Sequence, residues 1–376
     1  MKIAVICDFP FWDAKVGTAV RMESLCRSLA KICDLTIIAS VTMDPKFRAA
    51  AATLPYEIID RSTLQKHHEE TPHIQISGVR PDRQVTVKGV KHLVEAGGFD
   101  AVLTPYFNRD WMVRHINQSV LRIVDTHDCQ SQRTRSFAAH GLVPTFPMTP
   151  QEEGAELDRY DIALALSDAD QAEFAAITDT PVVTAPFRLP PKPIYSVRDM
   201  AGEVMFIAAK SDVNDMTLAY LLEQVLPLVP RTLTLHVVGN VTVPETCPAN
   251  VKLVRHLDVE DLAWIYRAVD LALNPTYAGG GIKTKTLEAI AYGVPVITSD
   301  EGARGLETLL PDDLVCNDKE SFAHRIATLL DDPERRMALS RHMLDALRNE
   351  DSDSWLPVFA HLLRAAHARK HAVRAA

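Results

Sequence analysis

The stretch NPTYAGGGIKTKTLEAIAYGVPVIT, Asn274–Thr298, decides the fold, because it joins a strand, a glycine loop, a helix and a second strand. The apolar run Leu271–Pro275 overlaps its start and predicts a buried strand. Gly279, Gly280 and Gly281 follow, and residues without a Cβ let backbone N–H groups approach a ligand closely. The stretch therefore predicts a loop that can hold a phosphate group.

A helix is expected to begin near Ile282, which places Lys283 and Lys285 in its first turn. The free N–H groups at a helix N-terminus bind anions. The helix dipole disfavours lysine at that end, so the two lysines violate the usual preference for acidic residues in the first turn of a helix. Such violations are expected at functional sites, and a bound anion explains them better than helix stability does. We therefore predict that Gly279 to Lys285 bind a diphosphate.

Glu288 lies three residues after Lys285, so both side chains project from one face of the predicted helix. A lysine at the phosphate end and a carboxylate one turn later suit a nucleoside diphosphate, with the carboxylate accepting hydrogen bonds from two ribose hydroxyls. An ordinary Lys–Glu surface pair is the alternative.

The segment GGGIKTKTLEAIAYGVPVIT resembles the donor-binding signature of GT-B glycosyltransferases of the large family-4 type, which are retaining enzymes that use nucleotide-activated sugars. The resemblance implies that Lys285 stabilises the leaving phosphate, that Glu288 holds the ribose, and that Lys283 stands where many members have arginine. Many members carry another glutamate eight residues before the ribose glutamate, and here that position is Gly280. Recognition of the sugar hydroxyls is then lost or taken over by the amides of Gly280 and Gly281.

The length of 376 residues suits two domains of about 150–200 residues each. Short apolar runs alternate with helical segments, which indicates doubly wound parallel sheets of the α/β class. The resemblance implies the GT-B fold, with two Rossmann-like domains facing a cleft and a C-terminal helix crossing back. We predict an acceptor-binding domain over 1–187, joined by 355–376, and a nucleotide-sugar-binding domain over 188–354. The proline-rich segment Pro186–Ser196 is the expected linker.

The composition argues against a nucleic-acid-binding protein, a metal site and a membrane-spanning protein. A hydrophobic content of 47%, a charged content of 24% and a net charge of −9 describe a globular protein without a nucleic-acid partner. The six cysteines form no CxxC pair, which predicts reduced thiols in the cytoplasm and no metal site. No apolar run reaches the roughly 18–20 residues that a membrane span needs, so contact with the inner membrane face is expected to be peripheral.

The chain opens with a predicted strand, Lys2–Asp8, followed by a loop with Gly17 and a helix. No GxGxxG pattern follows this strand, which argues against an NAD-dependent enzyme. The resemblance places Gly17 and Thr18 near the donor phosphate or the acceptor, and a plain helix entry is the alternative.

A second polar cluster ends the predicted strand of SVLRIVDTHD, where Asp125, His127 and Asp128 stand. Open α/β sheets bind ligands outside the carboxyl ends of their strands. The resemblance implies that His127 points at the donor sugar, and Asp128 is expected to raise its pKa or orient it. His127, Asp128 and Lys285 are thus the predicted catalytic residues. Alternatively, Asp128 caps the next helix and His127 is structural.

The second half repeats the strand–helix pattern. The strand VMFIAA leads to Lys210, which the resemblance places on the donor diphosphate, and a helix is expected over 214–229. The base is expected near His256 and Leu257, before a helix from about Asp258. In the first half, the polar segment His67–Gln84 is expected to be an irregular surface loop.

The leading hypothesis is a metal-independent, retaining glycosyltransferase that uses a nucleotide-sugar as co-substrate and no other cofactor. The acceptor is a glycan, a lipid-linked sugar, a protein or a small molecule. One alternative is a nucleotide-sugar-binding protein with little activity, suggested by Gly280. Another is a GT-B epimerase of nucleotide-sugars.

Overall fold

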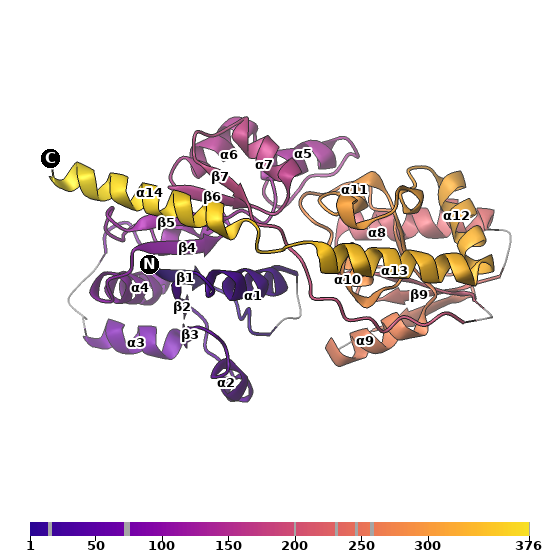
Figure 1. The fold of residues 1–376 in the computed structure, drawn as a ribbon, viewed down its shortest axis with the longest axis horizontal. Coiled ribbons are helices and arrows are strands. Elements are labelled where there is room, and N and C mark those ends of the chain that lie inside the picture. The colour runs from indigo at the N-terminus through magenta and orange to yellow at the C-terminus, as the bar shows by residue number, and fades with distance from the viewer. Residues whose placement is uncertain are drawn as a thin grey trace. The chain divides into compact units, whose positions relative to one another are not determined.

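The computed structural model describes residues 1–13, 17–70, 76–198, 201–229, 232–244, 247–255 and 259–375. Contacts divide the chain into two compact units. The first comprises residues 1–129, 148–187 and 352–376, and the second comprises 130–147 and 188–351. The predicted division puts 130–147 in the first domain, whereas the contacts group this segment with the second unit. Both units are α/β, as predicted (Figure 1).

The described part of the first unit is built on a seven-stranded parallel sheet in the order β3-β2-β1-β4-β5-β6-β7. The strands are β1 (Lys2–Cys7), β2 (Asp34–Ala39), β3 (Glu57–Ile59), β4 (Ala101–Pro105), β5 (Leu121–Asp125), β6 (Ile162–Ala165) and β7 (Val182–Thr184). The helices are α1 (Gly17–Leu29), α2 (Pro45–Ala51), α3 (Arg61–Glu70), η1 (Pro81–Arg83), α4 (Gln84–Ala96), η2 (Phe107–Met112), α6 (Pro150–Leu157), α7 (Asp168–Ala175) and α14 (Leu356–Ala375).

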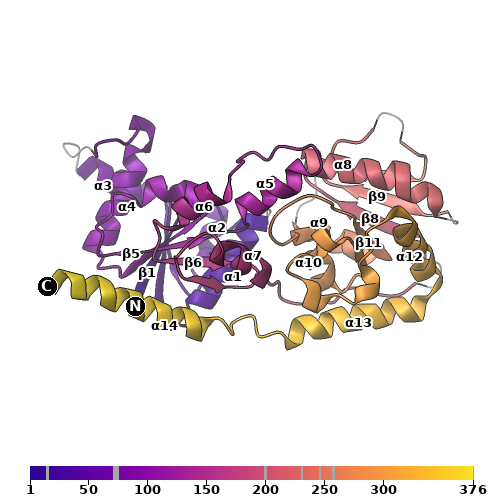
Figure 2. The ribbon, with the colours of Figure 1, turned by 90° about the horizontal axis from the view of Figure 1, so that it is seen from above.

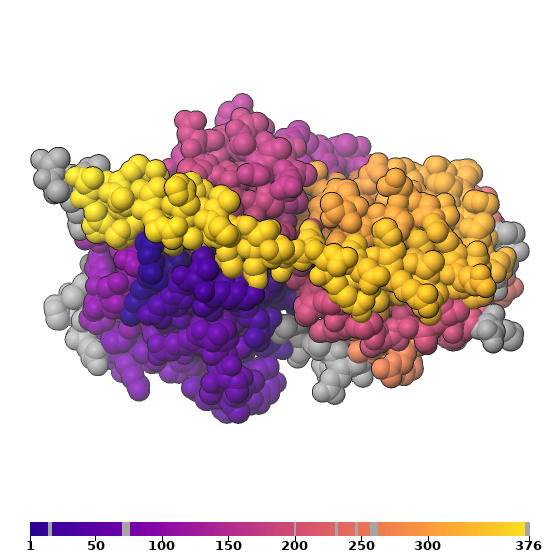
Figure 3. All heavy atoms as spheres, in the orientation of Figure 1, coloured from indigo at the N-terminus to yellow at the C-terminus, as the bar shows by residue number. Residues whose placement is uncertain are grey.

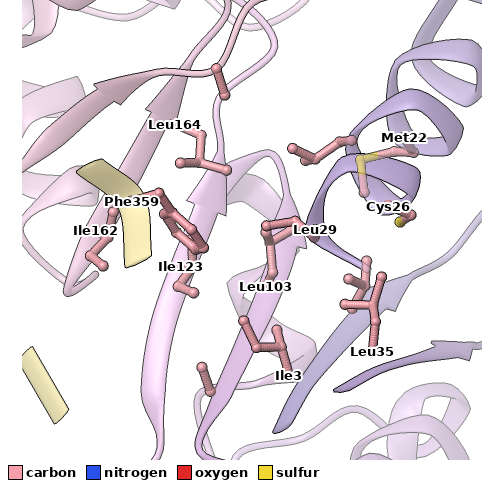
Figure 4. Close-up of a cluster of buried hydrophobic side chains, with 14 of the residues drawn as sticks. Ile3, Met22, Cys26, Leu29, Leu35, Leu103, Ile123, Ile162, Leu164 and Phe359 are labelled. Atoms are coloured by element: carbon pink, nitrogen blue, oxygen red, sulfur yellow. The ribbon is translucent and has the colours of Figure 1, made fainter. Parts of the chain in front are cut away.

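The alternation of side chains along β1 shows how this sheet is covered on both faces. Ile3, Val5 and Cys7 pack in one cluster with residues of α1 and α14, including Phe359 (Figure 4). Ala4 and Ile6 pack in a second cluster with α3, α4 and η2. The C-terminal helix α14 lies beside the N-terminus in Figures 1 and 2, and its atoms cover the start of the chain in Figure 3. It therefore belongs to the core of the first unit.

The described part of the second unit has a five-stranded parallel sheet in the order β10-β9-β8-β11-β12. The strands are β8 (Glu203–Ile207), β9 (Thr234–Val238), β10 (Val251–Val254), β11 (Leu271–Asn274) and β12 (Val296–Thr298). The helices are α5 (Gln130–Ala138), α8 (Asp212–Tyr220), η3 (Leu221–Val225), η4 (Leu226–Leu228), α9 (Val259–Ala268), α10 (Thr284–Tyr292), α11 (Asp300–Ala303), η5 (Glu307–Leu309), η6 (Asp312–Leu314), α12 (Lys319–Asp331) and α13 (Pro333–Asn349).

Three local predictions need correction, and a fourth is not tested. The helix after the glycines begins at Thr284 rather than near Ile282, with Lys283 as its N-cap. The helix expected over 214–229 changes to a π turn at Leu221 and to a 3-10 turn at Leu226. Pro227 lacks the N–H that a continuous helix needs. The segment 67–84 is partly regular, since it contains the end of α3 and η1. The expected start of α9 at Asp258 lies outside the described residues.

Phe359 provides a test of the packing of α14 on the first sheet. It is fully buried, whereas its neighbour Val358 is 56% exposed. We expect Phe359→Ala to lower the free energy of unfolding by about 3–5 kcal/mol, because the cavity it leaves cannot collapse fully. The control Val358→Ala is expected to change it by less than about 0.5 kcal/mol. Urea unfolding followed by circular dichroism measures both, and equal losses would contradict this packing.

Candidate functional site

The order of the second sheet identifies one strand junction where a ligand is expected. The chain winds outward in both directions from β8 and β11, which lie side by side. Ligands of open α/β sheets bind at such a switch point, beyond the carboxyl ends of the strands. Asn214, after β8, and Lys285, after β11, meet there, with Lys285 Nζ donating to Asn214 Oδ1 over 2.9 Å. This is the loop-helix unit that the sequence singles out.

The glycine loop is held in place by its neighbours. Gly281 has a φ of +59°, a conformation that favours glycine. The N–H of Gly279 donates to Ser136 Oγ of α5 over 3.1 Å. A Cβ on Gly279 would lie 2.9 Å from Lys283 Nζ. The close atoms belong to the flexible end of Lys283, which could move, and the amide of Gly279 already has a partner.

Lys283 is engaged by the protein itself. Its Nζ donates to the carbonyl of Gly281 over 3.0 Å and to Glu301 Oε1 over 2.7 Å. The side chains of Lys283 and Glu301 are 11% and 16% exposed. Lys283 thus closes the loop onto α11 with its charge neutralised, whereas the sequence predicts a cation directed at a phosphate.

Lys285 has a different environment. Its Nζ lies 4.9 Å from the centre of the Phe206 ring, and its hydrogen-bond partner Asn214 is uncharged. Burial lowers the pKa of Lys285 to about 7, and the charge of Lys283 adds to this shift. In the described part of the chain it forms no ion pair with a carboxylate. An anion bound beside this desolvated lysine would favour its charged form.

Glu288 faces Tyr266 of α9 rather than Lys285. The Tyr266 hydroxyl donates to Glu288 Oε2 over 3.4 Å, and its ring stacks on Tyr292. Burial raises the pKa of Glu288 to about 7, against the opposing effects of Tyr266 and Lys192. The Lys–Glu surface pair is not formed, because each partner bonds elsewhere.

Two further features lie near the strand ends of this unit. Lys210 follows β8 and is exposed, and its backbone N–H donates to Asn240 Oδ1 over 2.8 Å. A pocket of about 650 Å³ lies beyond β9 and β10 and includes Asn240 and Arg255 in its lining. Arg255 Nη1 donates to the carbonyl of Val241 over 2.9 Å. The predicted base contacts His256 and Leu257 follow Arg255 and lie outside the described residues.

The first unit carries the second candidate group, at the ends of β4 and β5. Tyr106 and His127 are the two non-glycine residues with positive φ in the described ranges, at 59° and 61°. Their rings stack with centroids 4.1 Å apart and an interplanar angle of 13°. The Tyr106 hydroxyl lies 3.2 Å from Thr18 Oγ1, next to Gly17 at the start of α1. Strained residues of this kind cluster at functional sites.

His127 is buried, and its electrostatic environment differs from the prediction. Its Nε2 lies 3.2 Å from Asp125 Oδ2, without hydrogen-bond geometry. Burial lowers the pKa of His127 to about 4, although Asp125 acts in the opposite direction. The imidazole is therefore neutral at pH 7. The prediction that Asp128 raises this pKa is wrong. Asp128 is itself buried, and its N–H donates to the Thr126 carbonyl over 2.8 Å.

Sequence reasoning missed Arg21 and Tyr106. Arg21 of α1 is 2% exposed and holds Asp125 through two bonds, Nη2–Oδ1 at 2.8 Å and Nε–Oδ2 at 3.2 Å. A charged residue among the apolar positions of α1 is the signal that could have identified Arg21. Tyr106 follows Pro105 at a strand end, where ligands bind in such sheets.

In the described residues, no group of three or more His, Cys, Asp or Glu side chains is placed to hold a metal ion. None of the described helices combines the length and the apolar character that crossing a membrane requires.

One family model matches part of the chain. Residues 202–332 match the family model of glycosyl transferases group 1. No curated protein matches the sequence. The chain is similar to TarM of S. aureus, at 9% identity and a TM-score of 0.73, over 96% of this chain and 98% of that one.

Two further solved structures have the same architecture. Sucrose-phosphate synthase of Thermosynechococcus elongatus is 16% identical with a TM-score of 0.66, over the whole of both chains. HepE of Anabaena, determined with UDP and glucose, is 15% identical with a TM-score of 0.60, over 97% of this chain and all of that one. At these identities the likeness shows the fold, and the family match covers the second sheet. The chain therefore has the GT-B fold, and the match of residues 202–332 to glycosyl transferases group 1 supports a glycosyltransferase.

Proposed function

We propose that the protein transfers a sugar, with retention and without a metal ion, from a nucleotide-sugar to an acceptor bound by the first domain. The observation that carries the proposal is Lys285, a buried lysine at the switch point of the second sheet that forms no ion pair with a carboxylate among the described residues. TarM and HepE have been crystallised with UDP, which supports a nucleotide-sugar donor. The acceptor is a glycan, a lipid-linked sugar, a protein or a small molecule.

In this proposal the donor lies along the strand ends of the second unit. The diphosphate binds Lys285, the amides of Gly280 to Ile282 and the exposed Lys210. Glu288 accepts hydrogen bonds from the ribose hydroxyls, and the base enters the pocket beside Arg255. Lys285 then stabilises the charge that develops on the departing diphosphate. The leaving phosphate itself accepts the proton of the acceptor hydroxyl, so no carboxylate nucleophile is required.

The first domain contributes the stacked pair of Tyr106 and His127. A neutral imidazole can donate a hydrogen bond to a sugar oxygen from one nitrogen and accept one at the other. Arg21 and Asp125 fix the backbone next to His127, and Asp128 is proposed to keep the turn in place. Thr18, which follows Gly17 at the start of α1, contacts the Tyr106 hydroxyl.

Glu288→Gln tests the assignment of the ribose site. Loss of the charged acceptor is expected to weaken binding of the nucleoside diphosphate by about 1.5–3 kcal/mol at pH 8. The contribution of Glu288, measured as the difference in affinity between the wild type and Glu288→Gln, is expected to shrink as pH drops below about 7, because Glu288 must lose its proton to accept hydroxyls. Calorimetry between pH 5.5 and 8.5 measures both effects. An unchanged affinity in the variant would contradict the ribose assignment.

His127→Ala tests the first domain. Turnover is expected to fall at least tenfold, because the side chain is proposed to face the sugar, while affinity for the nucleoside diphosphate stays within about twofold. His361→Ala, an exposed position on α14, is the control. Wild-type turnover in His127→Ala, measured with saturating donor, would assign His127 a structural role.

Lys285→Ala and Lys283→Ala test the proposed function itself. Loss of Lys285 is expected to slow the single-turnover rate by about 100-fold, or about 2.7 kcal/mol, because it removes one preorganised charge at the transition state. Lys283→Ala is expected to cost less, since that ammonium is already paired with Glu301. The proposal fails if Lys285→Ala changes only the Michaelis constant of the donor. Binding without turnover across an acceptor panel would favour a nucleotide-sugar-binding protein instead.

A further inference from the structure

Glu301 is a carboxylate beside the glycine loop, and its element is packed closely against β11. The helix α11 begins directly after Ser299, whose Oγ accepts from the N–H of Gly302 over 3.1 Å. A Cβ on Gly302 would lie 2.1 Å from Thr298 Oγ1 and 2.8 Å from the carbonyl of Asn274. The backbone next to Glu301 therefore has a fixed position against the end of the strand that leads into the loop.

The same segment is tied to α10, the helix that carries the two lysines. Thr286 Oγ1 donates to the carbonyl of Gly302 over 2.9 Å and accepts from Asn274 Nδ2 over 2.7 Å. Thr286 is fully buried and Asn274 nearly so. Because these bonds are shielded from water, they hold Glu301 and the loop in one arrangement.

The two oxygens of Glu301 have different surroundings. Oε1 accepts from Lys283 Nζ over 2.7 Å and lies 3.2 Å from where a Cβ of Gly279 would stand. Oε2 makes no hydrogen bond within the described ranges, and the side chain keeps 16% of its surface exposed. One oxygen is thus fixed by the lysine, and the other is open beside the loop.

The charge of Lys283 explains how a carboxylate can stand in an anion site. Two like charges a few ångströms apart repel each other strongly at a partly buried position. A bare carboxylate beside a diphosphate would therefore oppose donor binding. Paired with Lys283, Glu301 contributes little net charge but keeps its capacity to accept hydrogen bonds. The glycines at 279–281 have no side chain that could accept in its place.

We propose that Glu301 accepts hydrogen bonds from hydroxyls of the donor's sugar, with Lys283 as the residue that positions and neutralises it. The inference rests on the proposed function, because it needs the diphosphate at the glycine loop. The sugar is attached to the outer phosphate, so its hydroxyls lie within a few ångströms of the loop. Charge-assisted O–H···O bonds of about 2.5–2.7 Å are strong enough to distinguish sugars by the position of a hydroxyl.

The test compares a nucleoside diphosphate with its sugar derivative in calorimetry. UDP, GDP, ADP and dTDP are titrated into the wild type, and the tightest of them is then compared with its glucose and N-acetylglucosamine derivatives. We expect Glu301→Gln to leave affinity for the diphosphate unchanged or higher, and to weaken the preferred sugar derivative about tenfold or more. Asp300→Asn, an exposed carboxylate on the same helix, is the matched control and is expected to change neither affinity.

A deoxy-sugar series makes the outcome specific. If Glu301 accepts from one hydroxyl, the donor lacking that hydroxyl should bind the wild type and Glu301→Gln equally well. Equal weakening of the diphosphate and its sugar derivative in Glu301→Gln would show that Glu301 only holds the loop, and would overturn the inference. A wild type that binds none of the four diphosphates would overturn the proposed function, and this inference with it.

Discussion

The buried side chain of Asn274 is the constraint on which the arrangement of the second unit's candidate site depends. Its Oδ1 accepts from Thr276, its Nδ2 donates to Thr286, and its backbone carbonyl accepts from Thr298. These four residues are each at most 2% exposed. Leaving a buried polar group without its hydrogen-bond partner costs about 1–3 kcal/mol of stability. Arrangements that break one of these bonds are therefore less stable than the observed one. The end of β11, the start of α10 and α11 are thereby fixed together.

In the first unit, two strained residues are held in place by a buried ion pair and a backbone hydrogen bond. Tyr106 and His127 both adopt left-handed conformations, which cost about 1–3 kcal/mol each for residues with a Cβ. The Tyr106 N–H donates to the Asp125 carbonyl over 2.8 Å, and Arg21 holds the Asp125 carboxylate through two bonds. These contacts compensate for the strain and fix the stacked rings in one orientation. A buried ion pair is weak support for stability, but it is well suited to fixing geometry.

The sequence predicts the α/β class, the parallel sheets and the strand–loop–helix–strand unit over 274–298, because those features follow from local periodicity and glycine placement. It does not predict the partners of the two lysines. Glu301 is 18 residues from Lys283, and Asn214 is 71 residues from Lys285. The pair of Arg21 and Asp125 spans 104 residues. Such pairs are set by sheet order and close packing, which no local pattern encodes.

Local sequence patterns can also oppose one another, as leucine spacing and a proline do in the helix after β8. Leucines at helical spacing predict a continuous helix after β8, but Pro227 ends it early through a π turn. Lys283 and Lys285, at the start of α10, show that the surroundings of a residue also decide what it can do. They are two residues apart and chemically identical, yet one is neutralised by Glu301 and the other is desolvated against Phe206. The second lysine has no carboxylate partner among the described residues, and an anion bound there would stabilise its charged form. Lys283 is thus suited to position the loop, and Lys285 is suited to stabilise a leaving group. Their environments differ, although the two residues are of the same type.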